Sequence, residues 1–247
     1  MHLVSDSRAS DGAIRALADA STAARDLETW RIIGGHMVNL HALQAGVDLP
    51  TRATRDADLA VDLLAVRAGG LLQRLDELGY RNTASSNRFV RDTPNATATI
   101  DILAPSYSTR HESNVDAGTI AVDGIPALHV ALARPPVVLD ITAVLTDDTQ
   151  ISTVVNVPDV LSAIALKTFA YAERFAARDA EDLYRLFEVA HHAGLTADAW
   201  PAQPTFVAAA RRLRTFFDSP GRALPAAAAS RQQQVRLRAL VRSVVGS

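Results

Sequence analysis

The stretch Thr54-Arg-Asp-Ala-Asp-Leu-Ala-Val-Asp62 is the part of the chain from which the fold is most readily inferred. We predict a β-strand here, because alternate side chains would form one apolar face and one acidic face. The residues of the acidic face are Asp56, Asp58 and Asp62. Neighbouring carboxylates repel each other unless a cation or bound water offsets the repulsion. The pattern therefore indicates either a cation-binding strand or a solvated edge strand.

An apolar run upstream, Trp30 to Ile33, predicts a short strand that is followed directly by Gly34-Gly35. The residues from His36 to Leu43 have the pattern of a helix. A glycine pair between a strand and a helix lets the backbone approach a phosphate, where the helix amides favour negative charge. Many glycine pairs are simply turns, so both interpretations stay open.

A third aspartate lies in the strand predicted from Ala96 to Leu103, where Asp101 shares a face with Thr99. An aspartate among β-branched residues in mid-strand is unfavourable by propensity. Asp101 is therefore either a partly buried, hydrogen-bonded carboxylate or a ligand of the same cation.

Lys167 is the only lysine of the chain, and it lies among apolar residues in a helix predicted from Val160 to Phe175. If this helix continues, Arg174 and Arg178 fall on the same face as Lys167 and form a cationic stripe. The acidic residues of the continuation are Asp179 and Asp182. A lysine in this setting favours a functional role over an ordinary solvated one.

Three carboxylates and one lysine have a common chemical use. Carboxylate oxygens hold Mg²⁺ together with substrate phosphates, and two such ions clamp the attacking and leaving oxygens of a phosphoryl-type displacement. Lys167 would neutralise the triphosphate or the leaving pyrophosphate. Asp101 would be the ligand nearest the incoming hydroxyl, either as a general base or as a metal ligand only.

Composition excludes several other classes. The 247 residues are 48% hydrophobic and 21% charged, with a formal net charge of −2, as in a soluble globular protein. The chain has no cysteine, which excludes disulfides, thiolate zinc sites and cysteine nucleophiles. We expect a cytoplasmic protein without a membrane partner, because no long apolar run and no secretory signal are evident.

The C-terminal region is basic. From Thr205 onward the only acidic residue is Asp218, whereas there are eight arginines, at positions 211, 212, 214, 222, 231, 236, 238 and 242. A basic surface favours contact with phosphates, and a coding bias toward arginine on helix faces is the alternative. Helices are predicted over 205–217 and 232–245, joined by a Pro/Ala-rich link at 220–230.

The remaining elements complete an outline. Further helices are predicted over 11–28 and 66–79, a strand pair over 80–81 and 88–91, and two to four strands between 115 and 157. The change to helix near Pro158 predicts two domains, residues 1–157 and residues 158–247, of which the second contributes Lys167.

These segments resemble a known family in their order along the chain. Ile33-Gly-Gly-His-Met-Val-Asn-Leu-His41, followed by Arg52-Ala-Thr-Arg-Asp-Ala-Asp-Leu59, is similar to the first motif of the nucleotidyltransferase superfamily in its AbiEii/MenT toxin-like branch. Thr99 to Leu103 resembles the strand of the third carboxylate, and Leu161 to Leu183 resembles the lysine helix and the Asp-containing helix after it. The resemblance spans Trp30 to Leu186 and implies an α+β fold: a polymerase-β-like mixed β-sheet flanked by helices, with a C-terminal helical lobe.

The resemblance also implies roles for individual residues. Metal ligands and catalytic carboxylates would be Asp56, Asp58 and Asp101, with Lys167 as the catalytic cation. The residues of the nucleotide site would be Gly34, Gly35, His36, Arg52, Thr54, Arg55, Lys167, Asp179 and Asp182. Many superfamily members carry serine after the first glycine, whereas this chain continues with Gly35 and His36, which weakens the phosphate contact.

The implied function is that of a Mg²⁺-dependent nucleotidyltransferase, an enzyme of the EC 2.7.7 type and the toxin of a toxin–antitoxin system. It would transfer NMP from an NTP to an acceptor such as tRNA, with a cognate antitoxin as a further partner. Two alternatives stay open: a transferase acting on a small molecule such as an antibiotic, or on a protein, and a catalytically idle binding module.

Overall fold

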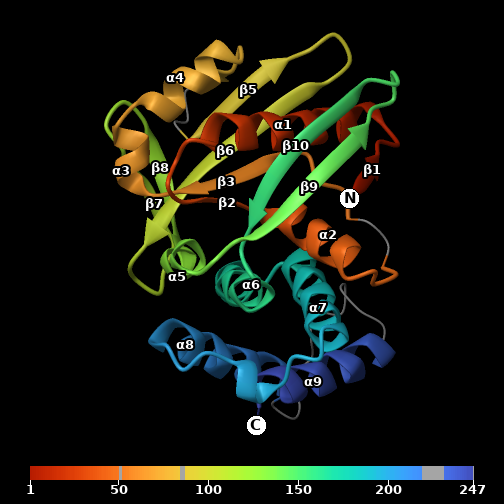
Figure 1. Ribbon diagram of the computed structural model, residues 1–247. Helices are drawn as coiled ribbons and strands as arrows, with labels where there is room; N and C mark the ends of the chain where they lie inside the picture. The colour runs from red at the N-terminus through yellow and green to blue at the C-terminus, as the bar shows by residue number, and fades with distance from the viewer. Residues whose placement is uncertain (50–51, 84–86, 219–230, 247) are drawn as a thin grey trace. The chain divides into compact units, whose positions relative to one another are not determined.

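The computed structural model describes residues 1–49, 52–83, 87–218 and 231–246 (Figure 1). The predicted link at 220–230, together with Arg222, lies outside the described residues. The chain has an α+β fold with mixed sheets flanked by helices, as predicted.

The strands are β1 (His2–Val4), β2 (Trp30–Ile33), β3 (Ala57–Val61), β4 (Arg81–Asn82), β5 (Arg88–Asp92), β6 (Thr97–Ser106), β7 (Glu112–Asp116), β8 (Ala121–Pro126), β9 (Val137–Val144) and β10 (Gln150–Val157). The α-helices are α1 (Arg8–Ala24), α2 (Gly34–Gln44), α3 (Leu63–Arg67), α4 (Gly70–Glu77), α5 (Leu128–Ala133), α6 (Val160–Arg174), α7 (Ala177–His192), α8 (Pro204–Leu213) and α9 (Arg231–Val245). A 3-10 turn covers Ala197–Ala199, and a π-helical turn covers Arg214–Asp218.

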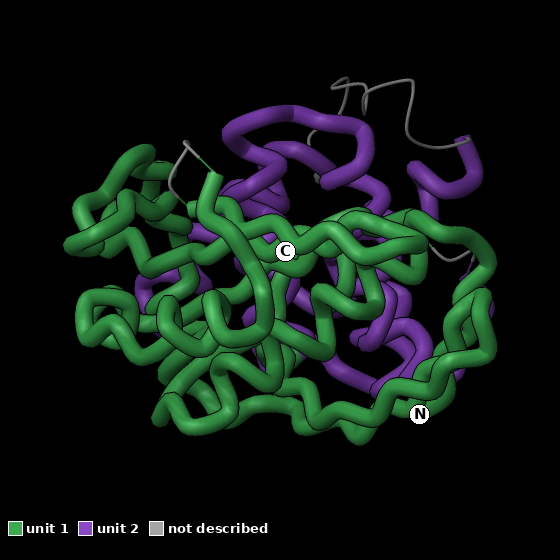
Figure 2. The backbone as a smooth tube through the Cα atoms, turned by 90° about the horizontal axis from the view of Figure 1, so that it is seen from above, with its two compact units in different colours: residues 1–37, 51–159 green, residues 38–50, 160–247 purple. Residues whose placement is uncertain are grey.

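The chain divides into two compact units, which Figure 2 shows in different colours. Unit 1 comprises residues 1–37 and 51–159, and unit 2 comprises residues 38–50 and 160–247. This division reflects spatial grouping alone, and it does not test the predicted domains 1–157 and 158–247. Those domains therefore stay a prediction.

Unit 1 is built on two sheets. The larger one has the strand order β2-β3-β6-β5-β4, and β8 pairs with both β6 and β7. It is mixed, because β3 runs parallel to β6 while β2 and β5 are antiparallel to their neighbours. The smaller sheet has the order β1-β9-β10. This mixed topology places the middle of β3 beside the middle of β6.

Helix α1 joins the two sheets of unit 1, since it packs against β6 of one and β10 of the other (Figure 1). Its packing face is made of small residues that are fully buried: Ala16, Ala20, Ala23 and Ala24. A side chain at Gly12 would collide with the carbonyl oxygen of Thr97, so a glycine is needed for this close approach to β6. Small side chains therefore hold α1 against the sheet that carries the aspartates.

The acidic stretch differs from its prediction at both ends. Strand β3 covers only Ala57–Val61, so Asp56 immediately precedes it. Asp62 is not on the strand's acidic face, because it is the N-cap of α3 and accepts a hydrogen bond from the Leu64 amide at 2.8 Å. Aspartate is a preferred N-cap residue, and at Asp62 this preference outweighs continuation of the strand.

Two helix predictions also change. The helix predicted over 66–79 is divided into α3 and α4 by Gly69, whose φ is +79°. Four strands occupy the region 115–157 or its edge, as predicted, and the short helix α5 between them was not predicted. A six-residue helix between strands gives too few turns for a clear 3.6-residue period.

In unit 2, α6 ends at Arg174 and α7 begins at Ala177. Phe175 has a φ of +48°, which interrupts the helix between them. The predicted stripe is therefore wrong in one member, because Arg178 lies on α7 and not on the helix of Lys167. Phe206 and Phe217, two of the aromatic residues of the basic region, are buried in the core of this unit.

None of the helices in the described parts of the chain is both long enough and apolar enough to cross a membrane.

Candidate functional site

The strand register of unit 1 places three charged residues in a row. Asp58 on β3 is directly opposite Asp101 on β6, and Asp101 is directly opposite Arg88 on β5. Residues opposite each other on neighbouring strands point to the same face of the sheet. The row therefore sets two carboxylates beside one guanidinium.

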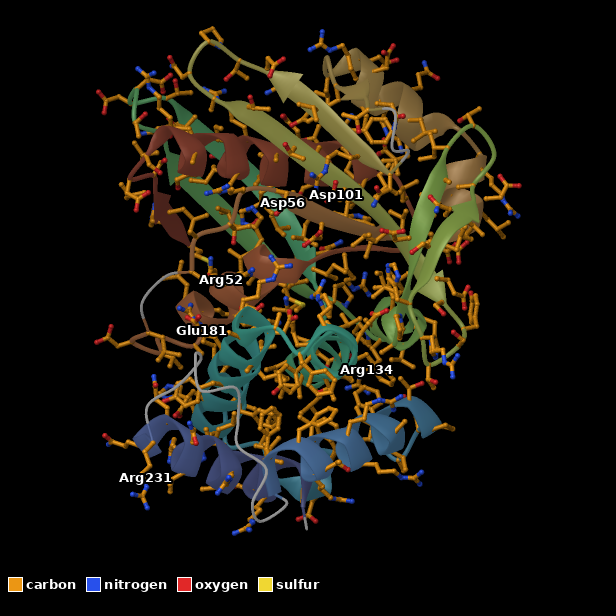
Figure 3. All side chains as sticks on the ribbon, turned by 180° about the vertical axis from the view of Figure 1, so that it is seen from behind. Arg52, Asp56, Asp101, Arg134, Glu181 and Arg231 are labelled. Carbon is orange, nitrogen blue, oxygen red and sulfur yellow. The ribbon has the colours of Figure 1, made fainter. Side chains whose placement is uncertain are left out.

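Arg88 binds Asp101 through two parallel hydrogen bonds. Its Nε and Nη2 donate to Oδ1 and Oδ2 of Asp101, each at 2.7 Å. Nη2 also lies 3.6 Å from Oδ2 of Asp56, and Figure 3 shows Asp56 and Asp101 next to each other. The hydrogen bonds to Asp101 raise the pKa of Arg88, and the charges of Asp101, Asp56 and Asp58 add to this effect against the opposing effect of burial. The aspartates thus form one anionic cluster around a cation.

The aspartates of this cluster have the oxygen donors that a metal ion needs. In the described ranges, no group of three or more histidine, aspartate or glutamate side chains is arranged to hold one as it stands. The predicted ligand Asp101 instead binds the guanidinium of Arg88, Asp56 lies 3.6 Å from that guanidinium, and the charge of Asp58 also acts on it. Carboxylate oxygens are the donors that Mg²⁺ prefers, and here they already stabilise a positive charge. The donor set fits a divalent cation in its chemistry, while Arg88 occupies its place.

The glycine turn packs against this cluster. Gly34 has a φ of +70°, and a side chain there would collide with the Asp58 carboxylate. A side chain at Gly35 would collide with the guanidinium of Arg52 and would come to 2.5 Å from Oγ of Thr54. Only glycine fits both positions, so the start of α2 lies directly beside Asp58, Arg52 and Thr54. Backbone amides at a helix start favour an anion.

The other predicted residues of this turn have distinct surroundings. Oγ of Thr54 is buried and has no hydrogen-bond partner among the described residues, while Arg55 is exposed. Burial lowers the pKa of His36 to about 4, against the effect of a hydrogen bond with the backbone of Ala13; the charge of Arg52 adds to the lowering. His36 is therefore neutral at pH 7.

In unit 2, two ion pairs join α6 to α7. Lys167 lies 2.7 Å from Asp182, whose side chain is fully buried. Arg174 donates two hydrogen bonds to Asp179, at 2.8 and 3.1 Å. Asp179 and Asp182 thus hold the two cations of α6, and their nucleotide-binding roles stay a prediction.

The basic C-terminal region is divided between internal and exposed arginines. Arg236 forms a two-point ion pair with Glu188, and Arg214 donates to the carbonyl oxygens of Val245 and Gly246. Arg212 lies over the ring of Phe169. The arginines at positions 211, 231, 236 and 242 are exposed, and of these Arg236 is the one paired with Glu188. Several arginines therefore stabilise the helices, and the basic surface is smaller than the sequence indicates.

The family model of the nucleotidyl transferase AbiEii toxin, type IV toxin–antitoxin system, matches residues 15–246. The chain belongs to the AbiEii family. It is a nucleotidyltransferase, as the sequence motifs imply, and the family is described as a toxin family.

One solved structure is similar to this AbiEii chain in its fold. An antigenic nucleotidyltransferase-like protein from Paracoccidioides brasiliensis is 14% identical, with a TM-score of 0.52, and the match covers 99% of this chain and 96% of that one. The antibiotic-resistance factor ANT(2'')-Ia is also 14% identical, covering 91% and 88%, but its TM-score of 0.30 carries no argument. No curated protein matches the chain.

Arg88 is the residue of this AbiEii site that has no signal in the sequence. It lies in a segment predicted correctly as a strand, thirteen residues before Asp101. Only the antiparallel register of β5 and β6 brings the two side chains together. That register depends on the length of the turn between the strands, which no local pattern around Arg88 indicates.

Proposed function

We propose that this AbiEii protein is the toxin of a toxin–antitoxin pair and transfers NMP from an NTP to an RNA acceptor such as tRNA, with Mg²⁺. The observation that supports this most directly is the placement of Asp58. Its carboxylate lies against the positive-φ glycine that begins α2, and it is opposite Asp101 on the neighbouring strand. Phosphate-binding and metal-binding groups are thereby adjacent within unit 1.

The phosphates of the NTP would bind at the start of α2. This helix is eleven residues long, and its first turn contains Gly34 and Gly35, beside which lie the Asp58 carboxylate and the Arg52 guanidinium. Arg52 supplies a positive charge at Gly35, and the buried hydroxyl of Thr54 supplies a donor. His36 orients this turn through its bond to Ala13 and does not add charge at neutral pH.

Asp56, Asp58 and Asp101 would hold the Mg²⁺. The metal would supply charge neutralisation at the NTP phosphates and at the reacting oxygens. The sheet's part is to fix Asp58 and Asp101 in register, so that little reorganisation of these two carboxylates is needed.

Lys167 would neutralise the triphosphate, as the resemblance to the lysine helix implies. Its ion pair with Asp182, at 2.7 Å, limits the rotamers of the Lys167 side chain. Asp179 holds Arg174 in the same way, one turn earlier on α7. We expect Asp182 and Asp179 to position these cations rather than to touch the nucleotide.

The RNA acceptor would be held by its backbone. The exposed arginines 211, 231 and 242 suit phosphate contacts. Base stacking on the aromatic residues of this region is not expected, because Phe206 and Phe217 are buried. Binding of the acceptor should therefore weaken steeply with salt.

The proposal is tested by incubating the purified protein with each α-³²P-labelled NTP, Mg²⁺ and total RNA. We expect label in tRNA-sized bands, and at least a hundredfold loss in Asp58→Asn, since metal-based charge stabilisation is worth several kcal/mol. Asp62→Asn is the matched control: it comes from the same acidic stretch, caps α3, and asparagine is an equally good cap. It should keep full activity.

Other outcomes would point elsewhere. Label on protein alone, or on an added aminoglycoside-like compound, would replace RNA as the acceptor. No NTP binding by calorimetry would indicate a catalytically idle module. For the toxin assignment, expression of the wild-type chain should arrest growth, Asp58→Asn should not, and a co-expressed partner gene product should restore growth.

A further inference from the structure

We infer that Arg88 is a built-in counter-cation that competes with the metal, and that a divalent ion binds only when the guanidinium releases Asp101. This inference rests on the proposed metal site. Arg88 uses both oxygens of Asp101, and its Nη2 lies 3.6 Å from Asp56. A metal that binds Asp101 together with Asp56 or Asp58 must approach these same oxygens.

The negative charges of the three aspartates explain why a cation lies among them. Three aspartates within interaction range of one another repel, and such a cluster is stable only with a cation among them. Arg88 meets this need without any ligand, because its planar fork matches the two carboxylate oxygens of Asp101. The folded chain therefore does not depend on metal to offset this repulsion.

The surroundings allow Arg88 to leave. Its side chain is 47% exposed, whereas that of Asp101 is 12% exposed. A released guanidinium would thus be hydrated at little cost, while Asp101 would stay in place on β6. A divalent ion brings twice the charge of Arg88 to the same oxygens, and the phosphates of an NTP would attract the released guanidinium.

Metal binding in the absence of nucleotide tests this inference. Free Mn²⁺ is measured by electron paramagnetic resonance while the full-length protein is titrated. Arg88→Gln should bind Mn²⁺ about tenfold more tightly than the wild type, because a competing positive charge is removed. Arg88→Lys, which keeps the charge but loses the two-point fork, should lie between the two.

A matched control comes from the neighbouring strand. Arg81 on β4 forms an exposed ion pair with Asp92 at 3.0 Å, so Arg81→Gln removes the same charge from the same sheet. It should leave Mn²⁺ affinity within about twofold of the wild type, since the surface charge is screened. Circular dichroism checks the fold, and if Arg88→Gln does not fold, the Arg88→Lys result decides.

A second measurement uses the wild-type protein and therefore does not depend on whether a variant folds. In ¹⁵N-arginine-labelled wild-type protein, the Nε–H of Arg88 should exchange slowly with water, because it donates a hydrogen bond to Asp101. Added Mg²⁺ should shift the signal of this Nε–H and speed its exchange with water.

The outcomes separate this inference from the proposed function. Equal or weaker Mn²⁺ binding by Arg88→Gln, with binding by the wild type, would overturn the role of Arg88 and leave the metal site standing. Absence of Mn²⁺ binding in every protein would overturn both. An unchanged Arg88 signal at saturating Mg²⁺ would show that the guanidinium stays on Asp101, against the inference.

Discussion

Each unit of this nucleotidyltransferase holds its charged residues in ion pairs, but at different depths. In unit 1, Arg88 is 47% exposed and Asp56 40% exposed. In unit 2, Lys167 is 10% exposed and Asp182 is fully buried. Arg88 is hydrogen-bonded to Asp101, which is 12% exposed, and Lys167 lies 2.7 Å from Asp182, so the two ion pairs differ chiefly in how far water reaches the cation.

Access to water determines what an ion pair can do. A half-exposed pair exchanges partners at little cost, because solvent replaces whatever is lost. A buried pair has no such replacement, and loss of one partner leaves an uncompensated charge. We therefore expect the cluster at Arg88 to exchange ligands and the pair at Lys167 to hold α6 and α7 together.

The substitution expected to cause the largest loss of stability is Lys167→Met. It leaves the buried carboxylate of Asp182 without its cation and should lower the free energy of unfolding by about 3–5 kcal/mol. Urea denaturation measures this loss. Activity alone is therefore a poor test of Lys167 as a catalytic residue, since a less stable protein also loses activity.

A compensating variant checks the cause. Lys167→Met combined with Asp182→Leu removes both charges and should recover more than half of the lost stability, since apolar replacements of buried pairs are often neutral or better. If the double variant is no more stable than Lys167→Met, the burial of Asp182 is not the source of the effect.

His36 is a buried titratable group of unit 1, and its burial makes stability depend on pH. The folded chain protonates His36 only near pH 4, whereas an unfolded histidine does so near 6.5. Between these values the unfolded state binds more protons, so stability falls as the pH decreases from 6.5 to 4. The difference corresponds to about 3 kcal/mol.

Urea denaturation at several pH values, compared between wild type and His36→Gln, measures this contribution. The variant should lack the loss between pH 6.5 and 4. His192→Gln is the control, because His192 is exposed at the end of α7, and it should follow the wild type. A variant curve parallel to the wild type would mean that His36 titrates normally.

The sequence was sufficient for the outline of this fold because the decisive patterns are local. Apolar alternation predicts β3 and β6, and helical periodicity predicts α6 and α7. The boundaries were less certain, since the cap at Asp62 and the positive φ of Phe175 depend on a single residue each. Local pattern also places no limit on how strands pair.

The candidate site shows the same limit. The importance of Asp58 was indicated by its spacing from Asp56, and the glycine pair by its position after β2. That Gly34 packs on the Asp58 carboxylate, and that Arg88 occupies the centre of the cluster, follow from strand register. Register is a tertiary property, so the counter-cation could not be predicted.

Gly34→Ala sharpens the comparison on the side of unit 1. The new side chain would meet the Asp58 carboxylate, and φ is +70°. Gly194→Ala in unit 2 is the matched control, because its φ is +71° and open space surrounds it. Both variants lose about 1 kcal/mol from the backbone conformation.

Gly34→Ala should lose about 1–3 kcal/mol more than the control, because the collision displaces neighbouring atoms. It should also weaken Mn²⁺ binding, while Gly194→Ala should not. Thermal and urea unfolding of both variants give the difference. Equal losses would mean that Asp58 moves aside freely and that the close packing is not required.

The smallest change in stability is expected for Arg88→Gln. The side chain of Arg88 is 47% exposed and that of Asp101 only 12% exposed, so loss of the guanidinium should cost about 1–2 kcal/mol without metal, less than the loss at Lys167. With Mn²⁺ at a concentration between the dissociation constants of variant and wild type, the variant should gain more stability, since ligand stabilisation grows with the ratio of concentration to dissociation constant. The stability gap between the two proteins in thermal unfolding should then narrow by about 0.7 kcal/mol for a tenfold difference in affinity. A loss of several kcal/mol that Mn²⁺ does not restore would instead place Arg88 with Lys167, as a structural cation, and the contrast between exchangeable and structural ion pairs would fail.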